Sequence, residues 1–251
     1  MRAKKASKLR FYWIAFMTGV YTFWYCSKVV TGSFILKNFR PFVTRQMIAW
    51  SKHLLGLIQV RVKVFGRDNL KENLERPIIV MCNHSSLYDI PISAVALNTN
   101  IRMLAKKELF KIPVFSAALR RGEFVSIDRH NREQSLKDLA NAKQKMLDGI
   151  ILWVAPEGTR SKDGQLAEFK KGGFHLALET RALIVPIVVK DIHKVQAGND
   201  LTLYLNQTIE VEVCEPVDVA DYNKDSRAEL VETVRTRMLD ALSHSKLENE
   251  Q

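Results

Sequence analysis

Cysteine is scarce in this chain of 251 residues, and the three that occur are scattered. Cys26, Cys82 and Cys214 show no C-x-x-C spacing, so they predict neither a disulfide framework nor a zinc site. We interpret them as small buried hydrophobic residues, and we expect no metal and no bound cofactor. Their pattern fits a protein that faces a reducing, cytoplasmic compartment.

Several motifs of other protein classes are also missing. No G-x-S-x-G elbow surrounds Ser85 and Ser86, which argues against a serine hydrolase. Gly172-Gly173 lies beside two lysines, but no G-x-x-x-x-G-K-[ST] loop is present to bind a nucleotide phosphate. His175 lies on a helix-like apolar stretch, which favours a structural role. The chain also lacks RNP-like and helix-turn-helix signatures, internal repeats and low-complexity linkers.

Acidic residues are rare in the first third of the chain. Residues 1–76 contain 15 Lys/Arg and 3 Asp/Glu, whereas residues 77–251 contain 23 and 24. We therefore expect two regions, a basic head (1–76) and a nearly neutral domain (77–251). A basic head suggests a polyanionic partner, either nucleic acid or an anionic membrane surface.

The aromatic residues of the head help to decide between these two kinds of partner. Twelve of the 22 Phe, Trp and Tyr residues fall within residues 1–50. Rings such as Trp13 and Tyr21 are amphipathic and settle at the lipid headgroup boundary, whereas arms that bind nucleic acid are rarely so apolar. The composition favours an anionic membrane surface, and we expect no nucleic acid partner.

No apolar run reaches the roughly 20 residues that a membrane span needs. The longest uncharged run of the head, Phe11 to Ser27, has 17 residues, and Lys and Arg flank it on both sides. The positive-inside bias would keep both flanks in the cytoplasm. We expect a helix, or a pair of helices, that dips into one leaflet from the cytoplasmic face (of the inner membrane if the protein is bacterial). A single span and a secretory signal peptide are the alternatives, and the bulky aromatic segment without an A-x-A-like site weakens the latter.

Beyond residue 76, strand-like and helix-like patterns alternate, which predicts a single α/β domain with a mostly parallel central sheet flanked by helices. The predicted strands are Ile78–Cys82, Phe124–Ile127, Ile150–Val154 and Leu183–Val189. The predicted helices are Ile90–Leu97, Ser135–Leu147 and Phe174–Glu179. Asp200–Val213 alternates with period two and predicts one or two strands with a solvated face. Apolar residues at every fourth position from Leu230 to Leu242 predict a closing amphipathic helix.

The segment Asn83 to Asp89, NHSSLYD, places an imidazole and a carboxylate five residues apart, just after a buried strand. Open α/β sheets bind ligands at this end of their strands. His84 in the loop and Asp89 at the start of the next helix can meet, and the carboxylate would then hold the imidazole in one tautomer so that it accepts a proton from a hydroxyl. The alternative interpretation makes Asp89 only a helix N-cap and His84 only a polar loop residue. The spacing alone does not decide between the two.

A second loop follows the strand Ile150–Val154 and reads PEGTRS, Pro156 to Ser161. Arg160 offers a planar fork suited to bidentate binding of a phosphate. Basic residues also crowd KKELFKIP (106–113) and RRGEFVSIDR (120–129). Taken singly, such loops are more often solvated surface, but three of them on one sheet suggest an anionic headgroup pocket.

These stretches together resemble the four-block pattern of the glycerophospholipid acyltransferase family, in which the 1-acylglycerol-3-phosphate acyltransferases are found. NHSSLYD resembles the first block, N-H-x-x-x-x-D. KKELFKIP with GEFVSIDR resembles the second block, PEGTRS the third and IVPIVV (184–189) the fourth, in the right order over residues 77–190. FKKGGFHLA (169–177) also resembles the family's stretch after the third block.

The resemblance implies transfer of an acyl chain from an acyl-CoA or acyl carrier protein thioester to the free hydroxyl of lysophosphatidic acid, which gives phosphatidic acid. By this resemblance His84 is the general base and Asp89 its orienting partner. Residues implied to bind the lysophospholipid acceptor are Glu157, Gly158, Thr159, Arg160, Arg129 and Lys106 or Lys107.

The sequence departs from the family pattern in two places. Ala155 stands where the third block commonly has Phe, and the interval from Gly122 to Arg129 is one residue longer than usual. Both departures bear on acceptor specificity more than on reaction type. The alternatives are therefore another lysophospholipid or an acylated amino lipid as acceptor, or a membrane-binding protein without catalysis. The intact His84 and Asp89 argue against the last, because a binding module needs no base.

Overall fold

The central sheet of the protein is mostly parallel, as the sequence predicts. The structure is a computed structural model that describes residues 4–71, 76–128, 130–196 and 202–244. In this part of the chain, eight strands form one sheet in the order β2-β9-β7-β3-β6-β4-β5, with β10 beside β7. The strands from β7 to β5 are parallel, and β9 is antiparallel to β7. Their bounds are β2 (Arg61–Phe65), β3 (Ile78–Cys82), β4 (Ile101–Lys106), β5 (Val125–Ile127), β6 (Ile151–Val154), β7 (Leu183–Val189), β9 (Thr208–Val213) and β10 (Val217–Asp218).

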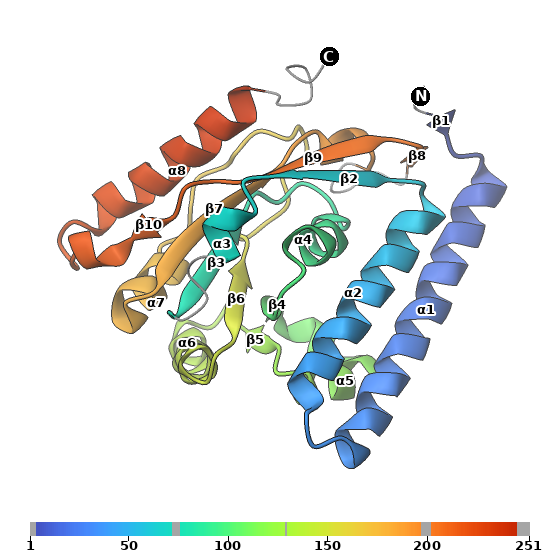
Figure 1. Cartoon of the computed structure of the whole chain (residues 1–251), viewed down its shortest axis with the longest axis horizontal. Helices are drawn as coiled ribbons and strands as arrows, with labels where there is room; N and C mark the ends of the chain where they lie inside the picture. Colours follow the sequence, from blue (N-terminus) through green and yellow to red (C-terminus); the bar gives the residue numbers. More distant parts are fainter. Residues whose placement is uncertain (1–3, 72–75, 129, 197–201, 245–251) are drawn as a thin grey trace.

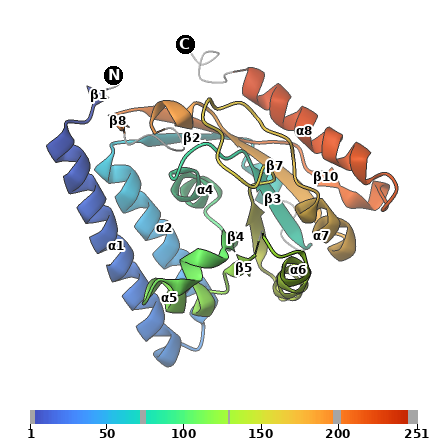
Figure 2. The ribbon, with the colours of Figure 1, turned by 180° about the vertical axis from the view of Figure 1, so that it is seen from behind.

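Helices cover both faces of this sheet, and the alternation of side chains along each strand divides the core between them. In β3, Ile78 and Val80 pack on one face with α4 (Asp89–Leu97), α2 (Phe39–Leu57) and α1 (Lys8–Ile35). Ile79 and Met81 point to the other face, where α6 (Arg132–Leu147), α7 (Gly172–Thr180) and α8 (Arg227–Ser243) pack. Figures 1 and 2 show these two groups of helices on opposite sides of the sheet. Because both faces are covered, the central strands are continuous apolar runs.

Shorter elements connect the layers. They are α3 (Asp68–Lys71), α5 (Phe115–Arg121) and the 3-10 helices η1 (Lys107–Lys111), η2 (Ile192–Lys194) and η3 (Val219–Asp221). A separate two-stranded ladder joins β1 (Lys4–Lys5) to β8 (Tyr204–Leu205). Because β1 lies just before α1, this ladder holds the start of α1 beside β8.

Most of the described part of the basic head forms two long helices that lie side by side, α1 and α2 (Figure 1). The face of α1 turned away from α2 carries large apolar side chains that are more than 60% exposed: Leu9, Tyr12, Phe16, Phe23 and Phe34. Their spacing keeps them on one side of the helix. We call this set the α1 stripe. No helix in the described part of the chain is both long and apolar enough to cross a bilayer.

Arginine side chains fasten the helical pair to the sheet. Arg102 of β4 is fully buried, and its guanidinium donates to the carbonyl oxygens of Gly122, Ile101 and Arg40 and contacts the hydroxyl of Thr44. Burial lowers the pKa of Arg102 to about 10. Because α2 supplies Arg40 and Thr44, this buried cation ties α2 to β4 and to the end of α5.

An ion pair at the surface supports the same junction. Nε and Nη2 of Arg40 donate to the two oxygen atoms of the Glu123 carboxylate at 2.7 and 2.6 Å. The hydrogen bond from Arg40 lowers the pKa of Glu123. The helical pair is therefore attached by charged side chains as well as by apolar packing.

The sequence predicted much of this architecture, with local differences. The strands β3 and β7 have the predicted bounds, and β5, β6, α4, α6, α7 and α8 lie where they were expected to within a few residues. Of the predicted strand segment 200–213, residues 200–201 lie outside the described residues, and the rest holds β8 and β9. The strands β4 and β2 were missed, because Arg102 interrupts one apolar pattern and β2 lies in the basic head. The division at residue 76 stays a prediction, although β2 pairs with β9 in the sheet.

Candidate active site

The two motif loops lie together at one edge of the sheet. His84 follows β3, and the PEGTRS loop follows β6, which is the parallel neighbour of β3. Parallel neighbours end at the same edge, so both loops start side by side. This arrangement explains how residues some seventy positions apart form one site.

His84 and Asp89 are in direct contact. The Nδ1 atom of His84 lies 2.7 Å from Oδ2 of Asp89, the first residue of α4. The Asp89 carboxylate is fully buried, and the same oxygen also accepts the backbone N–H groups of Ser85 and Ser86 at 2.8 and 2.9 Å. A carboxylate can only accept here, so we assign the proton to Nδ1 of His84 and the free lone pair to Nε2.

The imidazole of His84 is held but remains accessible. Its side chain is 19% exposed, and the edge of its ring packs against Trp153 with the ring centroids 6.2 Å apart. The indole of Trp153 is fixed in turn, because its N–H donates to the Ser93 hydroxyl at 3.1 Å. A ring that is fixed on one side and open on the other suits a general base.

The backbone of His84 is clamped by the PEGTRS loop. Its N–H donates to Oε1 of Glu157 at 2.7 Å, and its carbonyl oxygen accepts the N–H of Ser161 at 2.7 Å. The second oxygen of Glu157 accepts the N–H of Ala167 at 2.9 Å. Glu157 is only 2% exposed, and burial raises its pKa. Both oxygens of this carboxylate are thus engaged by backbone groups of the loops around His84.

Asn83 links the first and fourth blocks. Its side-chain amide donates to the carbonyl oxygen of Val189 and accepts the N–H of Val189, at 3.0 and 2.8 Å. Val189 ends β7, so this pair fixes the start of the loop that carries His84 to the neighbouring strand. The positions of Asn83, Trp153 and Ser161 were not singled out from the sequence, and only their places within or beside the blocks pointed to them.

The remaining residues of the PEGTRS loop are accessible. Gly158 has φ of +76°, a left-handed conformation that glycine adopts without strain, so the chain turns there. Thr159 is exposed and Arg160 is partly exposed. Within the described residues, no carboxylate forms an ion pair with Arg160. Among these residues its guanidinium has no acidic partner that an anionic ligand would have to displace.

The predicted basic residues of the second block are arranged differently. Lys107 forms an ion pair with Asp128 at 2.6 Å, and Lys106 lies 3.7 Å from Glu108. The hydrogen bond to Asp128 raises the pKa of Lys107. Arg129 lies outside the described residues. A role of these three residues in phosphate binding stays a prediction.

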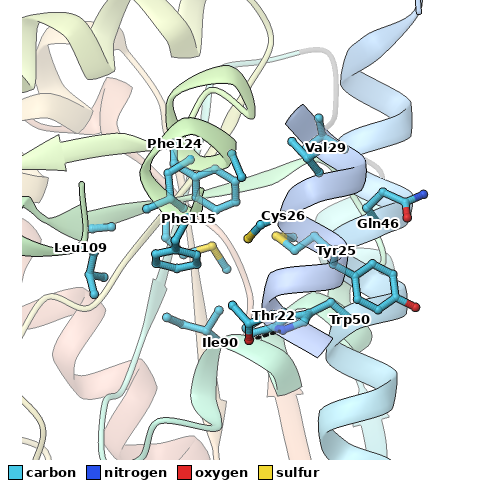
Figure 3. A pocket seen from close by; sticks show the side chains of 16 residues that line it. Thr22, Tyr25, Cys26, Val29, Gln46, Trp50, Ile90, Leu109, Phe115 and Phe124 are labelled. Atoms are coloured by element: carbon cyan, nitrogen blue, oxygen red, sulfur yellow. Dashed lines mark hydrogen bonds between the residues drawn. The ribbon is translucent and has the colours of Figure 1, made fainter. Parts of the chain in front are cut away.

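An apolar cavity lies between the helical pair and the domain (Figure 3). Its volume is about 140 Å³. Side chains from α1, α2 and α5 line it, and Ile90, which directly follows Asp89, forms part of its wall. Figure 3 shows Cys26 of α1 facing Phe115 and Phe124 across this space. Burial raises the pKa of the Cys26 thiol to about 11, so the thiol stays protonated at neutral pH.

Within the described residues, no three His, Cys, Asp or Glu side chains gather closely enough to hold a metal ion. The groups available to a reaction at this site are the imidazole, its buried carboxylate partner and a guanidinium. Such a set can deprotonate a hydroxyl and hold an anion next to it.

Comparison with known proteins agrees with this set of groups. The model of the Acyltransferase family matches residues 61–190, so the chain belongs to the acyltransferase family and is an enzyme of that class. The chain is 34% identical over 171 residues to a 1-acyl-sn-glycerol-3-phosphate acyltransferase of Cocos nucifera, covering 67% of this chain and 54% of that protein. A protein of Saccharomyces cerevisiae with the same description is 32% identical over 197 residues, which cover 76% of this chain and 62% of the yeast protein. The chain thus spans less than two thirds of both relatives.

A solved structure resembles nearly the whole chain. The crystal structure of the 1-acyl-sn-glycerophosphate acyltransferase PlsC from Thermotoga maritima superposes with a TM-score of 0.81 at 26% sequence identity. The match covers 94% of each chain. It therefore includes the amino-terminal helices as well as the α/β domain.

Proposed function

We propose that this chain transfers an acyl group from a thioester, of coenzyme A or acyl carrier protein, to the free hydroxyl of lysophosphatidic acid, which gives phosphatidic acid. The observation that carries the proposal is the contact between His84 and Asp89, which leaves one ring nitrogen of His84 accessible. The printed names of the relatives support the choice of acceptor.

In the proposed reaction, Nε2 of His84 accepts the proton of the acceptor hydroxyl as its oxygen attacks the thioester carbonyl carbon. The C–O bond forms, the C–S bond breaks, and the imidazolium returns the proton to the departing thiolate. The buried Asp89 carboxylate stabilises the imidazolium that exists between these steps. The reaction requires no redox change, and each proton that is taken is given back.

Arg160 is proposed to bind the phosphate of the acceptor. It lies one residue before Ser161, whose N–H donates to the carbonyl oxygen of His84. A phosphate held there would keep the acceptor hydroxyl close to the imidazole, and this proximity lowers the barrier. Thr159 and Gly158 would line the same side, and Glu157 would act by holding the loop.

The apolar cavity is proposed to take an acyl chain. Its walls are almost entirely hydrocarbon and aromatic, and it begins beside the helix that carries Asp89. Burying an alkyl chain is favourable by about 0.8 kcal/mol for each methylene group. Such a cavity would hold the substrate without any polar contact along the chain.

Membrane association is proposed to occur through α1, at the cytoplasmic face. The α1 stripe exposes large apolar side chains, and the basic head surrounds them with Lys and Arg. An apolar stripe inserts into one leaflet while the cations attract anionic lipids. The site would then receive its lipid acceptor directly from the bilayer.

The test is acyl transfer by the purified chain and by a His84→Ala variant. Each would be incubated in mild detergent with acyl-CoA or acyl carrier protein thioesters and with lysophosphatidic acid, other lysophospholipids or glycerol 3-phosphate. We expect phosphatidic acid from the wild type alone, identified by mass spectrometry. Equal turnover by His84→Ala would remove His84 from the mechanism, and product from another acceptor alone would correct the substrate.

A further inference from the structure

A cationic groove lies at the junction of α1 and α2, next to the α1 stripe. It has a volume of about 340 Å³ and is lined by Arg10, Trp13, Tyr21, Lys52, His53, Gly56 and Leu57. Its lining adjoins that of the apolar cavity, which begins at Thr22 on α1 and ends at Trp50 on α2. We infer that this groove binds the anionic phosphate headgroup of a membrane lipid, a site separate from the one where the acceptor reacts. The inference deepens the proposed function and rests on the membrane association of α1.

The lining of the groove contains basic residues and no acidic residue. The first Asp or Glu of the chain is Asp68, beyond both helices. In the described residues, neither Lys52 nor Arg10 forms an ion pair. A site with cations and no anion attracts an external phosphate.

Two of the lining side chains, Arg10 and His53, are held in place. The guanidinium of Arg10 stacks over Trp13 with 4.4 Å from Cζ to the ring centroid, and one of its nitrogen atoms donates to the Leu57 carbonyl oxygen at 3.2 Å. Arginine has further donors besides the one used here. This stacking keeps the remaining donors on the groove side at little cost in side-chain entropy.

His53 is the second positioned group. Its Nδ1 lies 2.8 Å from the Ala49 carbonyl oxygen and 3.1 Å from the Tyr25 hydroxyl, and its ring packs against Tyr21. A carbonyl oxygen only accepts, so Nδ1 carries a proton, and Nε2 is the nitrogen left for a ligand. The ring is fixed by three neighbours although the residue is exposed.

The position of the groove favours a lipid over a free phosphate. Trp13 lines the groove, is 44% exposed and directly follows Tyr12 of the α1 stripe. A helix that lies in the interface with its stripe in the acyl region places its flanks at the level of the headgroups. Tyr21 and Trp13 are aromatic residues of the kind that occupy this level. A headgroup in the groove would therefore stay attached to chains beneath the stripe.

The test uses a lipid that is monomeric in water, because the diffuse attraction of a charged bilayer is then absent. The chain, labelled at histidine, would be titrated with dihexanoylphosphatidylglycerol while the imidazole signals of His53 and His84 are followed by NMR. We expect a saturable shift at His53, which dihexanoylphosphatidylcholine does not produce. Inorganic phosphate should bind at least about tenfold more weakly, since it lacks the apolar part.

Two variants and one control test the residues. Lys52→Ala should weaken the binding of the phosphatidylglycerol at least about tenfold, the value of a lost hydrogen bond to a charged group. Gly56→Glu adds a carboxylate to the lining where open space surrounds the glycine, so the variant should fold and lose binding. Arg45→Ala removes one charge from the same helix outside the groove and should bind like the wild type.

The outcomes separate this inference from the proposed function. Three results would each overturn the headgroup site. They are an equal response to phosphatidylcholine, equally tight binding of inorganic phosphate, and an equal loss of phosphatidylglycerol binding in Lys52→Ala and Arg45→Ala. Acyl transfer to a dispersed acceptor should be unchanged in Lys52→Ala. If this variant lost acyl transfer together with phosphatidylglycerol binding, the groove would belong to the reaction path and would not be a separate site. His84→Ala should lose transfer but keep the shift at His53. Failure of transfer in the wild type, with the shift intact, would refute the proposed function alone.

Discussion

Glu157 holds the backbone of His84, since Oε1 of the carboxylate accepts the His84 N–H at 2.7 Å while Oε2 accepts the N–H of Ala167. Resemblance to the family implied contact with the acceptor for this residue. The carboxylate is buried, and both of its oxygens accept backbone N–H groups. A role of Glu157 in binding the acceptor stays a prediction.

The first prediction concerns Glu157→Gln. The amide nitrogen of Gln would face a backbone N–H, so one loop contact is lost and His84 shifts. We expect kcat to fall about 10–100-fold with the KM for the acceptor nearly unchanged, since small misplacements of a catalytic group have effects of this size. Glu168→Gln, an exposed change in the same loop, is the control. A raised KM with normal kcat would instead indicate that Glu157 contacts the acceptor.

The second prediction concerns Arg160→Ala. If the guanidinium binds the acceptor phosphate, kcat/KM for lysophosphatidic acid should fall about 10–100-fold, because a charged hydrogen bond is worth about 1.5–3 kcal/mol. The loss should be much smaller for an acceptor without a phosphomonoester. Steady-state kinetics with both acceptors measure this, with Lys162→Ala as the neighbouring control. A uniform loss on both acceptors would show that the phosphate binds elsewhere.

The third prediction concerns the buried Arg102. In Arg102→Met, the carbonyl oxygens of Gly122, Ile101 and Arg40 lose their donor while remaining buried. We expect the free energy of unfolding to fall by about 3 kcal/mol, measured by urea denaturation, with proteolysis sites appearing first in α2. Arg45→Met, on the exposed part of the same helix, should be close to neutral. Stability equal to the wild type would mean that the hydrogen bonds of Arg102 do not help to hold α2.

The fourth prediction concerns acid. Arg40 lowers the pKa of Glu123 below its usual value of 4.5. The ion pair therefore stabilises the fold fully above that usual value and is lost as the pH falls through the lowered one. Between pH 6 and pH 3 the wild type should lose up to about 1 kcal/mol more stability than Glu123→Gln, the range for a partly exposed pair. Thermal unfolding at several pH values measures the difference, and parallel curves would contradict it.

The sequence was informative where local chemistry determines structure. The apolar runs of β3 and β7 predicted buried parallel strands. The H-x-x-x-x-D spacing allowed a contact between His84 and Asp89, and the structure has that contact. The sequence suggested a shared pocket for the loop after β6, but its place beside His84 follows from the pairing of β3 with β6.

The parts that sequence reasoning missed depend on partners far apart in the chain. Arg102 reads as a surface residue until the carbonyl groups that it satisfies are known, so β4 was not recognised. The ion pair between Lys107 and Asp128 joins residues 21 positions apart, so no local pattern predicted it. Glu157 belongs to the PEGTRS motif, but the direction of its carboxylate depends on the backbone N–H groups of His84 and Ala167, which no local pattern predicts.

The absence of acidic residues before Asp68 has a consequence for how the basic head responds to its surroundings. Lys and Arg keep their protons across the physiological range, and α1 and α2 contain no carboxylate that would neutralise or release charge on acidification. With His53 as the one histidine in these helices, the charge of the head stays nearly constant as the pH changes. Attraction to an anionic surface would then be weakened by salt, which screens it, and hardly by a change in pH.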